Sequence, residues 1–179
     1  MATQNILLAG FGGQGILFAG KVVAYAGLIE GKEISWLPSY GPEMRGGTAN
    51  CSVSISDEPI GSPLVLTPDI LVVMNVPSYE KFIDTPPAGA VVIADSTLVS
   101  ARCKRDDIKV FYIPATGIAD ENGLKGLANM IMLGKMLRET AFTDYESVKK
   151  AVAKSVPAGK EHLLVSNMKA VDIGMAYEG

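Results

Sequence analysis

The sequence Gly10-Phe11-Gly12-Gly13-Gln14-Gly15 indicates the class of architecture. It follows a short apolar run, residues 5–9, and it precedes a segment of about residues 15–30 whose apolar residues recur at helical spacing. A strand, a glycine-rich turn and a helix in this order are typical of the first unit of a parallel α/β sheet. The glycines would let a phosphate approach backbone N–H groups at the positive end of the helix.

The rest of the chain predicts further strands and then helices. Residues 48–55 alternate between apolar and polar side chains, which predicts a half-exposed, antiparallel strand. Continuously apolar runs instead indicate strands covered on both faces. The remaining expected strands are 33–37, 70–74, 90–94 and 110–113, and the expected helices are roughly 124–140, 144–155 and 161–177. We therefore expect one domain, residues 1–179, folded as a three-layer α/β/α Rossmann-like sandwich with a mixed, mostly parallel sheet.

Composition excludes several classes of protein. A formal net charge of −3 disfavours binding to nucleic acid or to an anionic membrane surface. Two cysteines, Cys51 and Cys103, and one histidine, His162, are too few for an iron–sulfur cluster or a histidine-rich metal site. The sequence has neither a signal-like N-terminus nor an apolar stretch of about 18 residues, so we expect a cytoplasmic protein.

The glycine-rich segment satisfies only half of a dinucleotide-binding fingerprint. The second half is an acidic residue at the end of the second strand, which holds the ribose hydroxyls. Here that strand ends in Trp36-Leu37-Pro38-Ser39, without a carboxylate. Three interpretations remain: a phosphate-bearing ligand, a partner's backbone, or a tight turn that binds nothing.

A second glycine-rich segment, Ser39-Tyr40-Gly41-Pro42-Glu43-Met44-Arg45-Gly46-Gly47, should emerge from the same edge of the sheet. Arg45 is the residue that we expect to contact an anion, because its planar guanidinium suits carboxylate or phosphate. Glu43 would orient that arginine. The alternative is a solvated loop with an internal contact between Glu43 and Arg45.

The two segments together closely resemble the gamma subunit, or gamma domain, of 2-oxoacid:ferredoxin oxidoreductases, especially those of the 2-oxoglutarate and branched-chain 2-oxoacid type. The resemblance continues in Pro68-Asp69, in Asn129 with Leu133-Gly134, and in Asn167 and Ala170 of the expected final helix. It spans essentially the whole chain. The ordered pair of glycine-rich segments is more specific than either segment alone.

The resemblance implies a noncatalytic subunit that docks beside its partners and helps to form the coenzyme A and substrate region. The partners implied are alpha and beta subunits and a ferredoxin-like delta subunit, with ferredoxin as the electron acceptor of the complex. The complex would use thiamine diphosphate, Mg²⁺, [4Fe-4S] clusters and coenzyme A, none of them bound by this chain alone. The ligand- or subunit-binding residues implied are Gly10, Gly12, Gly13, Gln14, Gly15, Ser39, Tyr40, Gly41, Pro42, Glu43, Arg45, Gly46 and Gly47.

Other polar residues admit two interpretations. Asn129 would either face the ligand cleft or bond a neighbouring loop carbonyl. Asp95-Ser96 is best explained as a helix cap or Asx-turn, and so is Pro114-Ala115-Thr116-Gly117, with more functional weight for the latter. Two hypotheses compete with the gamma-subunit interpretation: a free-standing NAD- or FAD-binding oxidoreductase that uses Gly10–Gly15, and a scaffold whose loops recognise only partner chains.

Overall fold

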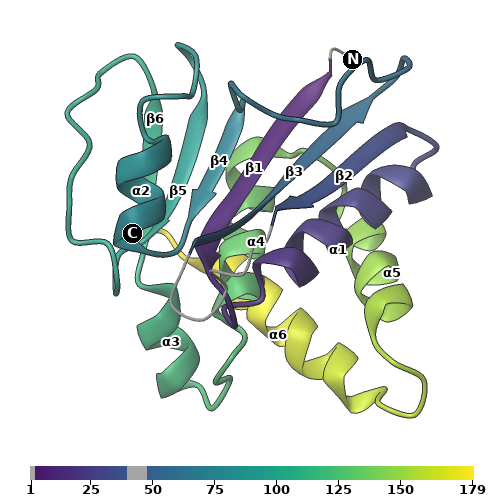
Figure 1. Cartoon of the computed structure of the whole chain (residues 1–179). Helices are drawn as coiled ribbons and strands as arrows, with labels where there is room; N and C mark the ends of the chain where they lie inside the picture. The colour runs from purple at the N-terminus through teal and green to yellow at the C-terminus, as the bar shows by residue number, and fades with distance from the viewer. Residues whose placement is uncertain (1–2, 40–47) are drawn as a thin grey trace.

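The structure is a computed structural model that describes residues 3–39 and 48–179. Its elements are β1 (Gln4–Phe11), α1 (Ile16–Ile29), β2 (Glu33–Ser39), β3 (Thr48–Ser56), β4 (Ile70–Val73), α2 (Val76–Phe82), β5 (Val91–Asp95), β6 (Lys109–Ile113), α3 (Ala115–Glu121), α4 (Ala128–Thr140), α5 (Tyr145–Ser155) and α6 (His162–Ala176). The sheet has the order β2-β3-β1-β4-β5-β6 (Figure 1). Strands β1, β4, β5 and β6 are parallel to one another. Strand β3 is antiparallel to both β1 and β2. The predicted α/β fold with a mixed, mostly parallel sheet is confirmed.

The two faces of the sheet are covered unequally. Ile6 and Leu8 of β1 point into a large core that is shared with α1, α4, α5 and α6. Leu7, between them, points to a smaller core with Tyr79 of α2 and Val65 of the segment before β4. Figure 1 shows α2 in front of the sheet and α4 behind it. One face therefore carries most of the helical layer, and the other is closed by a short helix and loops.

Strand β3 differs from its prediction in one respect. Its antiparallel pairing is confirmed, but the polar side chains that we expected to be exposed are buried: Ser52 is 2% exposed and Ser54 is 1% exposed. The backbone N–H of Val65 donates to Ser52 Oγ at 3.1 Å, and Ser54 Oγ donates to Asn5 Oδ1 at 3.0 Å. The expectation was wrong because the loop before β4 bonds the Ser52 hydroxyl and the neighbouring strand β1 bonds that of Ser54, so both are satisfied without water.

Two short helices were not predicted. Helix α2 has seven residues, and its start is capped by Asn75, whose Oδ1 accepts from the N–H of Ser78 at 2.8 Å. Helix α3 also has seven residues and follows β6 directly. Helix α4 begins at Ala128, later than the expected residue 124, because Gly123 and Gly126 adopt positive φ angles in the turn before it.

Helices α4 and α6 cross at two glycines. A Cβ atom on Gly134 would lie 2.0 Å from the carbonyl oxygen of Val171, and one on Gly174 would lie 2.0 Å from that of Ile131. Both atoms belong to the facing backbone, which cannot move aside as a flexible side chain can. The close approach explains why the crossing requires glycine at both positions.

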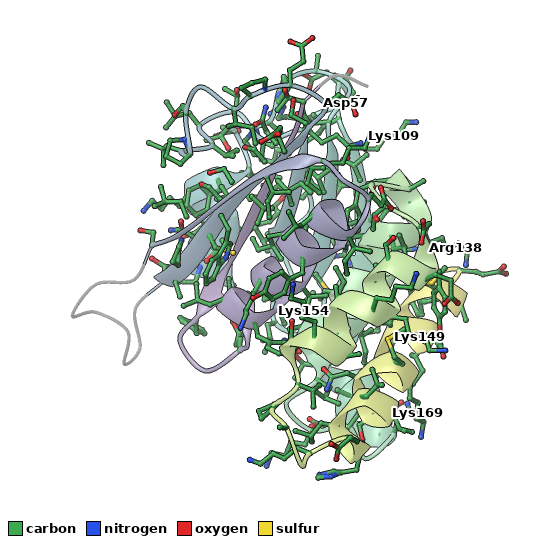
Figure 2. All side chains as sticks on the ribbon, turned by 90° about the vertical axis from the view of Figure 1, so that its right-hand side faces the viewer. Asp57, Lys109, Arg138, Lys149, Lys154 and Lys169 are labelled. Carbon is green, nitrogen blue, oxygen red and sulfur yellow. The ribbon has the colours of Figure 1, made fainter. Side chains whose placement is uncertain are left out.

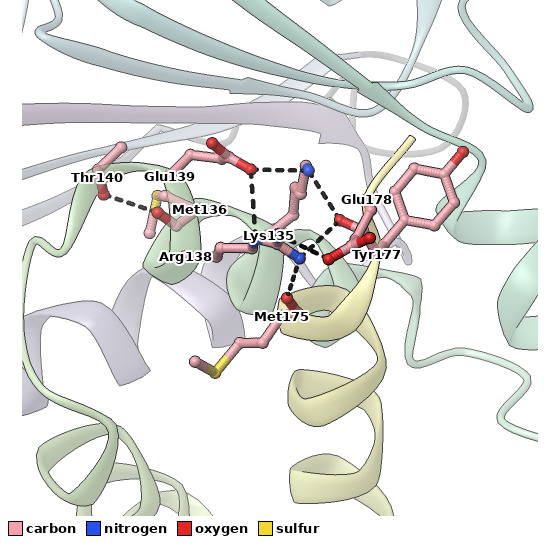
Figure 3. Close-up of polar contacts among 8 residues, drawn as sticks. All are labelled: Lys135, Met136, Arg138, Glu139, Thr140, Met175, Tyr177 and Glu178. Atoms are coloured by element: carbon pink, nitrogen blue, oxygen red, sulfur yellow. Dashed lines mark hydrogen bonds and ion pairs between the residues drawn. The ribbon is translucent and has the colours of Figure 1, made fainter.

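The end of α6 is held by two cations of α4 (Figure 3). Lys135 is 2% exposed, and its Nζ lies 2.8 Å from Glu139 Oε1 and donates to the carbonyl oxygen of Tyr177 at 2.9 Å. Arg138 Nη1 donates to the carbonyl oxygen of Met175 at 2.9 Å. These bonds satisfy carbonyls that a helix end leaves without intrahelical partners. The cluster therefore has a structural explanation in the docking of the C-terminal segment.

The outward sides of α5 and α6 are polar. Lys149 of α5 and Lys169 of α6 are exposed and point away from the sheet (Figure 2). The buried residues of α5, among them Val148 and Val152, face α1 and the core. Among the helices of the described residues, none has the length and apolar character that crossing a bilayer requires.

Candidate functional site

The glycine-rich segment Gly10–Gly15 joins β1 to α1 at the carboxyl edge of the parallel strands. Gly13 and Gly15 have φ angles of 91° and 74°, a region that L-residues rarely adopt. Gly15 is the N-cap of α1, and no side chain caps it. The first N–H groups of α1 therefore lie directly after the segment, at the positive end of a 14-residue helix.

The side chain of Gln14 holds this segment in shape. Its Oε1 accepts from the N–H of Phe11 at 2.6 Å, and its Nε2 donates to the carbonyl oxygen of Met74 at 3.0 Å. The amide thus links the end of β1 to the end of β4. Because both ends of the amide are used inside the protein, the geometry assigns Gln14 a supporting role in the segment.

Asn129 supports the same segment from α4. It is 4% exposed, and its Nδ2 donates to the carbonyl oxygen of Gly15 at 3.0 Å, while its Oδ1 accepts from the N–H of Met130 at 2.9 Å. The structure thus shows the second of the two interpretations of Asn129, a bond to the carbonyl of a neighbouring loop. A contact between Asn129 and a ligand stays a prediction.

Two cavities flank the segment, each of about 270 Å³. The first, which we call the α3 pocket, is lined by Gly13, Gln14, Met74, Leu98, Thr116, Ala119, Asp120, Lys125, Gly126 and Ala128. The second is lined by Phe11, Gly12, Gly13, Gly15, Ile16, Leu17, Phe18 and Ala49. Gly13 contributes to both, so the glycine-rich segment forms the wall between them.

Asp95 anchors the far wall of the α3 pocket. Its carboxylate is 0% exposed and accepts from the N–H of Thr97 at 3.0 Å, which is the expected Asx-turn. It also accepts from Thr116 Oγ1 at 2.6 Å and from the Thr116 N–H at 3.2 Å. A buried carboxylate needs such donors. The bonds to Thr116 fix the start of α3 against β5. The sequence indicated a helix cap or turn at residues 114–117, but not this link to Asp95.

The second glycine-rich segment falls largely outside the described residues. Ser39 is described, at the end of β2 and paired with Asn50. The predicted residues Tyr40, Gly41, Pro42, Glu43, Arg45, Gly46 and Gly47 lie outside the described ranges. On the other side of that gap, Thr48 pairs with Phe11, beside the first segment. The chain therefore leaves and rejoins the sheet at the edge where Gly10–Gly15 lies.

The cysteines are not arranged as metal ligands. Cys51 packs in the larger core, whereas Cys103 packs against the smaller core on the other face of the sheet. Burial raises the pKa of the Cys51 thiol to about 12, against a smaller opposing effect of a hydrogen bond from Trp36. Within residues 3–39 and 48–179, His, Cys, Asp and Glu side chains form no group of three or more that could hold a metal ion.

Comparisons with known proteins agree with this architecture. Residues 5–177 match the pyruvate ferredoxin/flavodoxin oxidoreductase family. The chain is 44% identical to the 2-oxoglutarate synthase subunit KorC of Methanocaldococcus jannaschii over 161 residues, which cover 88% of this chain and 86% of that protein. It is 41% identical to the ketoisovalerate oxidoreductase subunit VorA of Methanothermobacter thermautotrophicus over 97% of its own length, but it spans 36% of the length of that relative.

A solved structure shows the same fold. The gamma subunit of a keto/oxoacid ferredoxin oxidoreductase from Geobacter sulfurreducens superimposes with a TM-score of 0.85 at 30% sequence identity, covering 97% of this chain and 95% of that one. The chain therefore belongs to the pyruvate ferredoxin/flavodoxin oxidoreductase family, as a gamma-type member.

Proposed function

We propose that this chain is the gamma-type subunit of a complex that oxidatively decarboxylates a 2-oxoacid to an acyl-CoA, with ferredoxin as electron acceptor. Thiamine diphosphate, Mg²⁺ and the iron–sulfur clusters belong to the alpha, beta and delta partners. The cysteines of this chain do not fit a cluster, because Cys51 and Cys103 face opposite sides of the sheet. The chain itself contributes binding surface for coenzyme A or the substrate and for its partners.

One observation carries the binding role. The segment Gly10–Gly15 is held in a fixed shape by Gln14 and Asn129, while the N-terminus of α1 stays uncapped by any side chain. The N–H groups of Phe11 and Gln14 are used inside the segment, whereas the first N–H groups of α1 receive no side-chain cap and can donate to an anion. Such pre-organisation lowers the entropic cost of binding.

Arg45 tests the proposal. An anion held by one charge-assisted contact of about 1.5–3 kcal/mol should bind roughly ten- to a hundredfold more weakly without it. Arg45→Ala in the reconstituted complex is expected to raise the Michaelis constant for coenzyme A or for the 2-oxoacid, with normal assembly and cluster content. Arg45→Lys should restore only part of the loss, because a point charge cannot reproduce bidentate geometry. Steady-state kinetics beside gel filtration give the answer, and unchanged constants in an intact complex would contradict the binding role.

Nicotinamide binding distinguishes the competing hypothesis. Strand β2 ends in Pro38 and Ser39, without the carboxylate that holds an NAD ribose. Calorimetry of the isolated chain with NAD(H) is therefore expected to detect no binding in the range of about 1–100 μM, where such a site would bind. Tight stoichiometric binding of NAD(H) would favour the free-standing oxidoreductase instead.

A further inference from the structure

The α3 pocket has two walls of different chemistry. One wall is the glycine-rich segment with Gly13 and Gln14, backed by the apolar side chain of Met74. The other comes from α3 and the turn before α4, with Thr116, Asp120 and Lys125. A group bound between them would contact the segment at Gly13 and Gln14 on one side and the charged side chains of Asp120 and Lys125 on the other. The pocket is thus suited to a ligand that carries both an anionic group and hydroxyl groups.

Lys125 lines this pocket, and its ammonium group has no partner among the described residues. It is exposed, and within the described ranges it takes part in no ion pair, ring contact or side-chain hydrogen bond. By contrast, Lys135 is buried against Glu139, and Lys32 pairs with Asp57. An ammonium group at a pocket wall is well suited to a phosphate as a mobile point charge. Lys125 can therefore bind an anion without breaking an existing interaction.

Asp120 supplies the carboxylate that β2 lacks. In dinucleotide-binding folds an acidic side chain accepts hydrogen bonds from ribose hydroxyls. Here Asp120 lines the pocket from α3, on the same side as Lys125. A carboxylate alone would suit an unmodified ribose diol. A carboxylate accompanied by a free ammonium instead suits a ribose that carries both a hydroxyl and a phosphate.

We propose that Lys125 is a specificity-determining residue that binds the ribose 3′-phosphate of coenzyme A in the α3 pocket, while Gly10–Gly15 faces the pyrophosphate. This inference rests on the proposed function, because it takes coenzyme A to be the anion bound at this edge. It adds a reason why the site would prefer coenzyme A to an adenine nucleotide that lacks the 3′-phosphate. Asp120 accepts from the remaining ribose hydroxyl in the same arrangement.

Two substrates test it: coenzyme A and 3′-dephospho-coenzyme A, which differ only in that phosphate. In the reconstituted complex, Lys125→Ala is expected to raise the Michaelis constant for coenzyme A about tenfold, as removal of one exposed charge-assisted contact does. The constant for 3′-dephospho-coenzyme A should stay unchanged, because it lacks the group that Lys125 binds. Lys125→Arg should keep most of the preference for coenzyme A. Lys169→Ala, which removes an outward lysine of α6, serves as the matched control and should change neither constant.

The outcomes separate this inference from the function on which it rests. If Lys125→Ala raises both constants equally, or neither, the assignment of the 3′-phosphate is wrong. If Arg45→Ala still raises the constant for coenzyme A in that case, the proposed function stands alone. If neither variant affects coenzyme A or the 2-oxoacid, both proposals fail. Thermal unfolding of the Lys125 and Lys169 variants checks that each exposed side chain was replaced without loss of stability.

Discussion

Alanine at Gly134 is expected to lower the free energy of unfolding by about 2 kcal/mol or more. The new Cβ would lie 2.0 Å from the carbonyl oxygen of Val171, so α4 and α6 would have to move apart. Overpacking of this kind costs up to about 3 kcal/mol, occasionally more. The gain in helix propensity from Gly to Ala is about 1 kcal/mol, which is too small to offset it. Urea denaturation followed by circular dichroism measures the difference.

Gly61→Ala is the matched control for this variant. No atom lies within 4 Å of a Cβ built on Gly61, which lies in a loop. The substitution there should be neutral or slightly stabilising, because it reduces the entropy of the unfolded chain. Equal stability of Gly134→Ala and Gly61→Ala would show that the helix crossing tolerates a methyl group and that the two backbones are not in close contact.

The sequence predicted the strands better than the short helices, for a physical reason. Continuous apolar runs such as 70–74 mark strands that are buried on both faces, and β4 lies there. Helices α2 and α3 have seven residues each, too few for a helical period to stand out from the surrounding loops. The burial of Ser52 could not be foreseen either, because it depends on Val65, which only the folded chain brings to β3.

In the candidate site too, the features that depend on local sequence were predicted and those that depend on long-range contacts were not. The position of Gly10–Gly15 at the carboxyl edge of the sheet followed from its place between a strand and a helix. The support of that segment followed only in part: a bond from Asn129 to a loop carbonyl was one of two interpretations, but the sequence did not indicate Gly15, which lies 114 positions away along the chain. The α3 pocket likewise combines residues of the first turn with Thr116 and Lys125. Contacts of such long range leave no local pattern, and so they were found only in the folded chain.

Gly15→Ala is expected to be costly for both stability and binding. The φ angle of 74° places the residue in the left-handed region, which costs an L-residue roughly 1–2 kcal/mol. The new Cβ would also lie 2.3 Å from Asn129 Nδ2, a buried side chain held by its own hydrogen bonds. Loss of that bond leaves a buried donor without a partner, at a further cost of about 1–3 kcal/mol. We therefore expect a total loss of about 2–5 kcal/mol.

Gly31→Ala separates the two causes. Gly31 has a φ angle of 75° but no atom within 4 Å of its Cβ position, so alanine there carries only the backbone cost. The excess loss in Gly15→Ala over Gly31→Ala then measures the contact with Asn129. In the reconstituted complex, Gly15→Ala should also raise the Michaelis constant for coenzyme A at least tenfold, because the displaced segment misplaces the N–H groups at the start of α1. Equal losses of stability in the two variants, with unchanged kinetics, would mean that Asn129 does not hold the segment in its binding shape.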